Sequence, residues 1–110
     1  MFEVRRTAAF SEWLDSLSDP LGRAAVLTLL ARLALGNPGD VRPVGSAVSE
    51  LRIDVRPGYR VYYLRAGQAV YVLLAGGDKS TQAADIRRAV GMAEALRAAQ
   101  RPKKLARKPK

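Results

Sequence analysis

Arg52, Arg56 and Arg60 recur at every fourth position in the middle of the chain. A guanidinium group is planar, stays positively charged and donates paired hydrogen bonds to phosphate oxygens. Tyr59 and Tyr62 stand among these arginines, and aromatic rings stack on unpaired bases. The combination predicts a surface that binds the backbone of a nucleic acid, with single-stranded RNA as the best match.

A β-hairpin is expected to carry the three arginines. Within Ser49–Tyr63, apolar residues occupy alternate positions from Leu51 to Val55, which is the period of a strand with one buried and one solvated face. Pro57-Gly58 predicts a turn, and the aromatic and β-branched run Tyr59–Tyr63 predicts the returning strand. The arginines then share the polar face, where their mutual repulsion favours an anionic partner.

The alternative is a sheet face whose arginines are simply solvated. Arg52 would then pair with Asp54, and Arg60 with Glu50, along the same face. Exposed ion pairs contribute little to stability, so such pairs alone would not explain why three arginines gather there.

A second anion-binding point is expected at Gly76-Gly77-Asp78-Lys79-Ser80-Thr81. Ser80 is the expected N-cap of a helix, and the free N–H groups at a helix start attract negative charge. Lys79 adds a positive charge there. The stretch lacks the G-x-x-x-x-G-K-[ST] spacing, which argues against nucleotide hydrolysis. A plain strand-to-helix turn with a solvated lysine is the alternative.

Composition excludes several kinds of active site. The 110 residues suffice for one domain, expected over residues 1–99. The chain has no cysteine and no histidine, which excludes disulfides, cysteine-metal sites and the usual general base. We expect no metal and no other cofactor. Without a membrane-spanning run or a signal-peptide pattern, a cytoplasmic location is expected.

Positive charge is concentrated at the C-terminus. The net charge is +9, and six basic residues but no acidic ones lie in residues 101–110. Residues 100–110 are therefore expected to form a disordered basic tail. Such a tail either increases solubility or makes non-specific phosphate contacts.

The remaining elements predict an α+β fold with a small mixed sheet of about four strands and its helices on one side. The first strand is expected beside the last and parallel to it, because two helices supply the crossover. In the second helix, Leu21, Ala24, Ala25, Leu29 and Leu33 are expected to face the core. The expected elements are strands at Phe2–Arg5, Val41–Val44 and Ala69–Ala75, the hairpin, and helices at Ala8–Ser18, Pro20–Leu35 and Ser80 to about Ala99.

Three motifs carry a resemblance to a known family: Glu50-Leu51-Arg52-Ile53-Asp54, Pro57-Gly58-Tyr59-Arg60-Val61-Tyr62-Tyr63 and Gly76-Gly77-Asp78-Lys79-Ser80-Thr81-Gln82. In this order they resemble the addiction-module killer branch of the RelE/ParE toxin superfamily, with HigB-type toxins as near relatives. The resemblance covers Phe2 to Ala98. It implies a RelE-like fold and a type II toxin-antitoxin toxin that cleaves messenger RNA on the ribosome. It also implies a cognate antitoxin with a helix-turn-helix domain, through which alone the toxin would reach DNA.

The resemblance also assigns roles to single residues. Arg52 matches a basic position on the first hairpin strand, Arg60 matches the residue that contacts the scissile phosphate, and Lys79 matches the basic position after the last strand. RNA-cutting members often carry a second basic residue where Asp54 stands. They also often use a tyrosine or histidine on or near the last helix, where this chain has Gln82, Ala84 and Asp85.

The implied reaction needs no metal. The 2′-hydroxyl attacks the adjacent phosphorus and leaves a 2′,3′-cyclic phosphate and a 5′-hydroxyl. Arg52 and Arg60 would stabilise the phosphorane, and Lys79 the leaving oxygen. Arginine stays protonated, so the candidates for proton transfer are Tyr59, Asp54, Asp78 and Asp85. Further RNA contacts are expected from Arg56, Tyr62, Ser80 and Gln82.

Two other functions are compatible with the same residues. A ParE-like toxin would inhibit DNA gyrase without catalysis and would cause DNA-damage signalling but no message cleavage. A basic RNA-binding or ribosome-binding module would not be toxic. An antitoxin would need acidic side chains over the Arg52–Arg60 surface, or would hold the toxin so that it cannot enter the ribosome. An apolar edge at Leu27–Leu30 is a candidate part of that contact, although packing against the other helices is the commoner fate of such residues.

Overall fold

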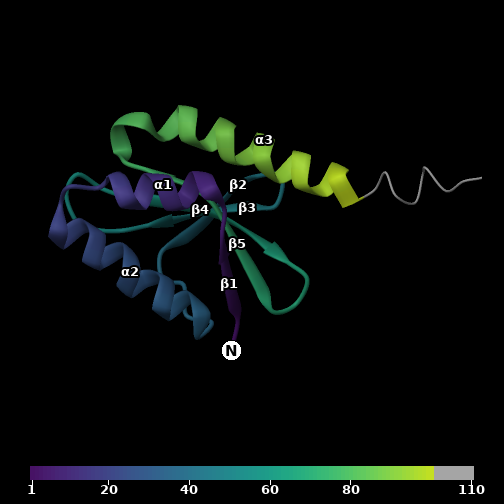
Figure 1. Ribbon diagram of the computed structural model, residues 1–110, viewed down its shortest axis with the longest axis horizontal. Coiled ribbons are helices and arrows are strands. Elements are labelled where there is room, and N and C mark those ends of the chain that lie inside the picture. The colour runs from purple at the N-terminus through teal and green to yellow at the C-terminus, as the bar shows by residue number, and fades with distance from the viewer. Residues whose placement is uncertain (101–110) are drawn as a thin grey trace, which may run out of the picture.

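A five-stranded mixed sheet forms the centre of the computed structural model, which describes residues 1–100 (Figure 1). The strand order is β1-β5-β4-β3-β2. The α+β class and the mixed sheet are as expected, and the strand expected at Val41–Val44 is present and pairs antiparallel with the first hairpin strand. The strands are β1 (Glu3–Arg6), β2 (Val41–Gly45), β3 (Val48–Arg52), β4 (Arg60–Ala66) and β5 (Val70–Gly77), and the helices are α1 (Ala8–Ser16), α2 (Pro20–Ala34), a short 3-10 helix (Lys79–Thr81) and α3 (Gln82–Gln100).

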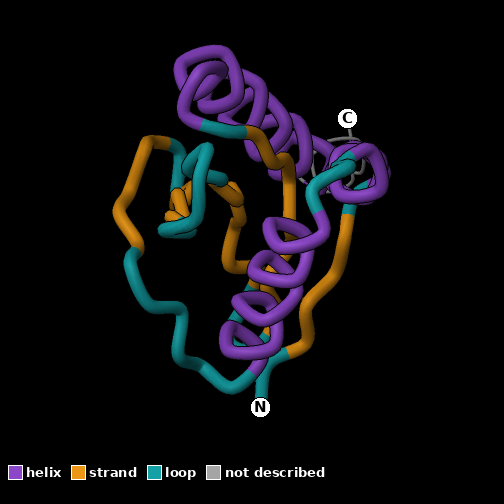
Figure 2. The backbone as a smooth tube through the Cα atoms, turned by 90° about the vertical axis from the view of Figure 1, so that its left-hand side faces the viewer, coloured by secondary structure: helices purple, strands orange, loops and turns teal. Residues whose placement is uncertain are grey.

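Helices cover both faces of the sheet, so the expectation of helices on one side is wrong. One core cluster joins α1 and α2 to side chains such as Leu51, Val61 and Leu73. A second cluster joins α3 to Tyr62 and Leu74 on the opposite face. Figures 1 and 2 both show α3 at the top of the molecule and α2 at the bottom. The two central strands, β4 and β5, are apolar on both faces, and both faces therefore need cover.

The N-terminal strand β1 lies parallel to β5, as expected, with Glu3 opposite Val70 and Arg6 opposite Leu73. Helices α1 and α2 form the crossover between the first strand and the rest of the sheet. Thr7 ties this crossover to β5, because its hydroxyl donates to the carbonyl of Leu73 at 2.9 Å and accepts the N–H of Phe10 at 3.1 Å. One side chain thus caps α1 and fixes where it starts on the sheet.

Helix α2 faces the core through a stripe that matches the expected one only in part. Its buried residues are Gly22, Val26, Leu30 and Leu33, so the expectation for Leu33 is confirmed. Ala25 and Leu29 also pack against the core, partly buried, as expected. The expectation is wrong for Leu21, which is 79% exposed, and for Ala24, which is exposed as well. Gly22 packs directly against the ring of Tyr59, where a larger side chain would not fit. The helix is rich in leucine and alanine all round, so its sequence period did not select one face.

Two further observations concern the helices and the C-terminal residues. None of the described helices combines the length and the apolar character that crossing a membrane requires. The expected basic tail lies outside the described residues, apart from Gln100.

Candidate nucleic-acid interface

A cleft of about 430 Å³ opens at the end of the β3–β4 hairpin. Its walls come from the loop of residues 53–58, from the ends of β3 and β4, and from the turn after β5. Four basic side chains line it, together with two aspartates: Arg52, Arg56, Arg60, Lys79, Asp40 and Asp54. The structure therefore brings together all four basic residues that the sequence singled out.

The register of the sheet explains this convergence. Arg52 lies opposite Arg60 across β3 and β4, and Arg60 lies opposite Gly77 across β4 and β5. Lys79 follows Gly77 by two residues and lines the same cleft as Gly58. The ends of β3 and β5 and the start of β4 therefore meet at the same edge of the sheet. β3 and β4 each contribute an arginine there, and the turn after β5 contributes Lys79.

The hairpin connection is a loop over residues 53–59 rather than a tight turn at Pro57-Gly58. The ladder ends with Ile53 donating to the carbonyl of Tyr59 at 2.9 Å, and Gly58 closes the loop by donating to Val55 at 2.7 Å. Gly58 has a φ of 88°, which favours glycine. Arg56 therefore reaches the cleft from the loop and not from a strand face.

Glu50 lies behind the cleft as a fully buried carboxylate, 0% exposed, between the sheet and α3. Tyr62, directly opposite on β4, donates its hydroxyl to Oε2 of Glu50 at 3.0 Å. Gln82, the first residue of α3, donates its amide to the same oxygen at 2.8 Å. Burial, and then the bond to Glu50, raises the pKa of Tyr62, which remains a donor. Because Tyr62 is also 0% exposed, the expectation that it stacks on RNA is wrong.

Three guanidinium groups approach the other oxygen of Glu50. The distances to Oε1 are 3.2 Å from Nε of Arg42, 3.5 Å from Nε of Arg52 and 3.6 Å from Nη1 of Arg60. The Arg60–Glu50 pair of the solvated alternative is thus present, but Arg52 pairs with Glu50 and not with Asp54. Three positive charges against one negative charge leave a net charge of +2 beside the cleft.

Tyr59 lies on the core side of the hairpin and does not line the cleft. It is 5% exposed, and its hydroxyl donates to Asp19 at 2.9 Å. Its ring packs edge-on against Trp13, with 6.1 Å between the centroids. Burial, and then the bond to Asp19, raises the pKa of Tyr59. The alternation of the strand turns Tyr59 away from Arg60, so the expected catalytic role of its phenol does not fit this position.

Of the carboxylates expected to move a proton, Asp54 is the one that lines the cleft. Asp40 also lines it, and its carbonyl accepts the N–H of Arg52 at 2.9 Å. Neither Asp40 nor Arg42 was singled out from the sequence. Arg42 lies opposite Glu50 across β2 and β3, and only the register of β2 would have revealed both residues. Among the described residues, no three or more aspartate or glutamate side chains gather in a way that could hold a metal ion.

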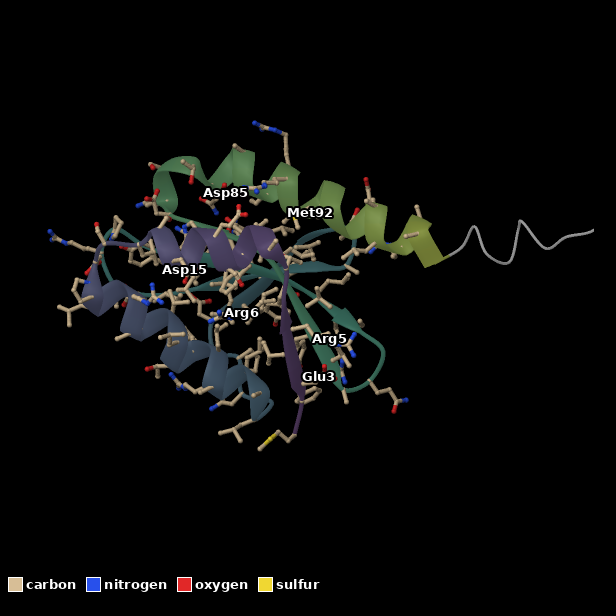
Figure 3. All side chains as sticks on the ribbon, in the orientation of Figure 1. Glu3, Arg5, Arg6, Asp15, Asp85 and Met92 are labelled. Carbon is tan, nitrogen blue, oxygen red and sulfur yellow. The ribbon has the colours of Figure 1, made fainter. Side chains whose placement is uncertain are left out.

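The turn after β5 is built around Asp78. Its carboxylate accepts the backbone N–H of Ser80 at 2.8 Å and the hydroxyl of Ser80 at 2.5 Å. These bonds lower the pKa of Asp78. Asp78 is therefore the N-cap of the 3-10 helix Lys79–Thr81. The expectation that Ser80 is the N-cap of the last helix is wrong, because Ser80 lies inside this short helix. Asp85, near the start of α3 (Figure 3), accepts the hydroxyl of Thr81 at 2.5 Å. Both carboxylates serve the turn and lie outside the cleft lining.

The acid sensitivity of the fold is expected to depend on Glu50. Burial alone would raise its pKa, but the hydrogen bonds from Gln82 and Tyr62 and the charge of Arg60 outweigh burial and lower the pKa. A carboxyl group with a lowered folded pKa stabilises the fold above its unfolded pKa of about 4.3, and loses that contribution as the pH falls through the folded pKa. Glu50→Gln should therefore lose less stability below about pH 4.3 than the wild type.

Urea unfolding at a series of acidic pH values would measure this difference. Glu12→Gln is the matched control, because Glu12 is exposed on α1. If Glu50→Gln and Glu12→Gln show the same dependence on pH, Glu50 does not carry the effect.

Comparison with known proteins places this chain in a family. The family model described as "Phage derived protein Gp49-like (DUF891)" matches residues 12–103. A protein of Haemophilus influenzae, described as "Uncharacterized protein", is 39% identical over 94 residues, which cover 86% of this chain and 95% of the relative. The chain therefore belongs to the Gp49-like family, a RelE-like family of toxins of toxin-antitoxin systems.

Proposed function

We propose that this toxin cleaves messenger RNA on the ribosome without a metal ion, as an mRNA interferase. The observation that carries the proposal is the convergence of Arg52, Arg56, Arg60 and Lys79 on one cleft. Fixed positive groups of this kind stabilise charge that develops on a phosphate during its reaction. Membership of a RelE-like toxin family supports the same function.

The residues of the cleft supply the parts of a transesterification. Asp54 accepts the proton of the 2′-hydroxyl, whose oxygen forms a bond to the adjacent phosphorus. Arg52 and Arg60 stabilise the charge of the phosphorane. The bond from phosphorus to the 5′-oxygen then breaks, Lys79 stabilises that oxygen, and a water molecule protonates it. Arg56, on the loop, holds a neighbouring phosphate.

The test uses purified toxin, ribosomes and a defined message. We expect cleavage of ribosome-bound message, with 2′,3′-cyclic phosphate and 5′-hydroxyl ends, and little cleavage of free message, because the ribosome positions the substrate. A parallel assay measures supercoiling by DNA gyrase. Intact message together with inhibited gyrase would replace the proposal with the ParE-like alternative, and no effect in either assay would leave a binding module.

We further propose that a cognate antitoxin silences the toxin by covering the cleft with acidic side chains. The family supports pairing with an antitoxin. The apolar edge expected at Leu27–Leu30 is only partly available, because Leu27 is 42% exposed and Leu30 belongs to the core. Co-expression with the adjacent gene should restore growth, and continued growth arrest would contradict the pairing.

A further inference from the structure

We infer that Glu50 is a positioning residue that orients the arginines of the cleft and also weakens their hold on the RNA ground state. This inference rests on the proposed function. Glu50 touches no substrate, because it is fully buried. It acts through Arg52 and Arg60, which do line the cleft.

The two oxygens of Glu50 have different partners. Oε2 accepts the neutral donors of Tyr62 and Gln82 at 3.0 and 2.8 Å. Oε1 faces the guanidinium groups at 3.2–3.6 Å. Tyr62 belongs to a central strand and Gln82 begins a helix, so Oε2 is anchored on two different elements. The anchored carboxylate therefore presents Oε1 as a fixed reference point for the arginines.

The guanidinium groups keep donors free for a phosphate. Each guanidinium carries five N–H donors, and one carboxylate oxygen accepts only about two hydrogen bonds. Arg52 bonds Glu50 through Nε alone, and Arg60 approaches it through Nη1 at 3.6 Å, so most of the donors of both groups are not used by Glu50. If the arginines served only to neutralise the buried carboxylate, one arginine would be enough. Three arginines on one oxygen instead leave oriented donors beside the cleft.

The same carboxylate opposes an incoming phosphate. A buried negative charge repels a second anion that approaches the same arginines, and burial makes this interaction stronger than it is in water. Oriented donors favour the transition state, whose charge they meet without reorganisation. Glu50 should therefore increase the rate of the chemical step and decrease the affinity for RNA at the same time.

Glu50→Gln separates these effects from simple stabilisation, because glutamine keeps the shape and loses the charge. We expect tighter binding of a fluorescein-labelled, 2′-O-methylated RNA oligonucleotide, measured by fluorescence anisotropy. We also expect cleavage at least about tenfold slower at saturating concentrations of programmed ribosomes. Glu12→Gln, which removes one exposed carboxylate elsewhere, shows how much of the binding change comes from net charge alone.

A structural role would reduce binding and cleavage together, in proportion to the folded fraction, and that result would overturn the inference. Unchanged cleavage by Glu50→Gln would overturn it as well. If Glu50→Gln does not fold, Glu50→Asp tests the inference instead. Aspartate keeps the negative charge, but its side chain is one methylene shorter, so the carboxylate lies farther from the arginines. This variant should bind RNA like the wild type and cleave more slowly. If the wild type itself cleaves no message, the proposed function fails, and the binding comparison still shows whether Glu50 opposes phosphate.

Discussion

Arg60→Ala is expected to lower cleavage of ribosome-bound message by about 100-fold or more, the usual cost of removing one donor to a charged transition state. Arg60 is the least exposed of the arginines around Glu50, at 12% of its side chain. A charge shielded from water interacts more strongly with the reacting phosphate. Growth arrest on expression should disappear together with cleavage.

Arg88→Ala is the matched control for Arg60→Ala. It removes the same charge from an exposed position on α3 and should retain nearly full activity. Circular dichroism and thermal unfolding would show that both variants are folded. If Arg60→Ala still arrests growth while it is folded, the cleft is not the active site.

Gly76→Ala is expected to reduce the free energy of unfolding by about 1–3 kcal/mol, the usual cost of forcing extra volume into a packed core. Gly76 belongs to β5, and the ring of Trp13 on α1 lies directly on it, so that an added methyl group would overlap the ring. The expected result is an outward displacement of α1 and an earlier transition in urea.

Two further variants make this prediction specific. Gly91→Ala adds the same methyl group on α3 where nothing lies within 4 Å, and it should stabilise the protein by about 0.5–1 kcal/mol because alanine favours helix. Trp13→Leu combined with Gly76→Ala should cost less than the sum of the single changes, because the smaller side chain leaves room for the methyl group. Additive costs would show that Trp13 is not what opposes Gly76→Ala.

Local patterns in the sequence predicted most of the fold. Alternation and turn residues identified the hairpin, and the helical pair predicted that the first strand would lie parallel to β5. The patterns failed where several solutions satisfy the same rule. The leucine-rich helix α2 offered more than one apolar face, and Gly22 against Tyr59 selects one of them. Asp78 and Ser80 are both good capping residues, and only the bond geometry distinguishes them.

The sequence predicted which basic residues form the candidate site, but it did not predict which residues those side chains contact. The spacing of Arg52, Arg56 and Arg60 suggested a shared surface, and the cleft contains all three with Lys79. Glu50 looked like an ordinary residue of the solvated face. Its importance depends on pairing with Arg42 and Tyr62 across two strands and on the cover that α3 provides. Such contacts are properties of the sheet register and have no local signature.

The parallel pairing of β1 with β5 also determines when the sheet can be completed during synthesis. The first strand finds its partner only after residues 70–73 have been synthesised, and the anchor of Glu50 on Gln82 is made later still. Chains emerge in order from the N-terminus, so a nascent copy has no complete sheet while most of it is being made. The sheet, and with it the cleft that Glu50 supports, is therefore completed only after α3 has begun to emerge.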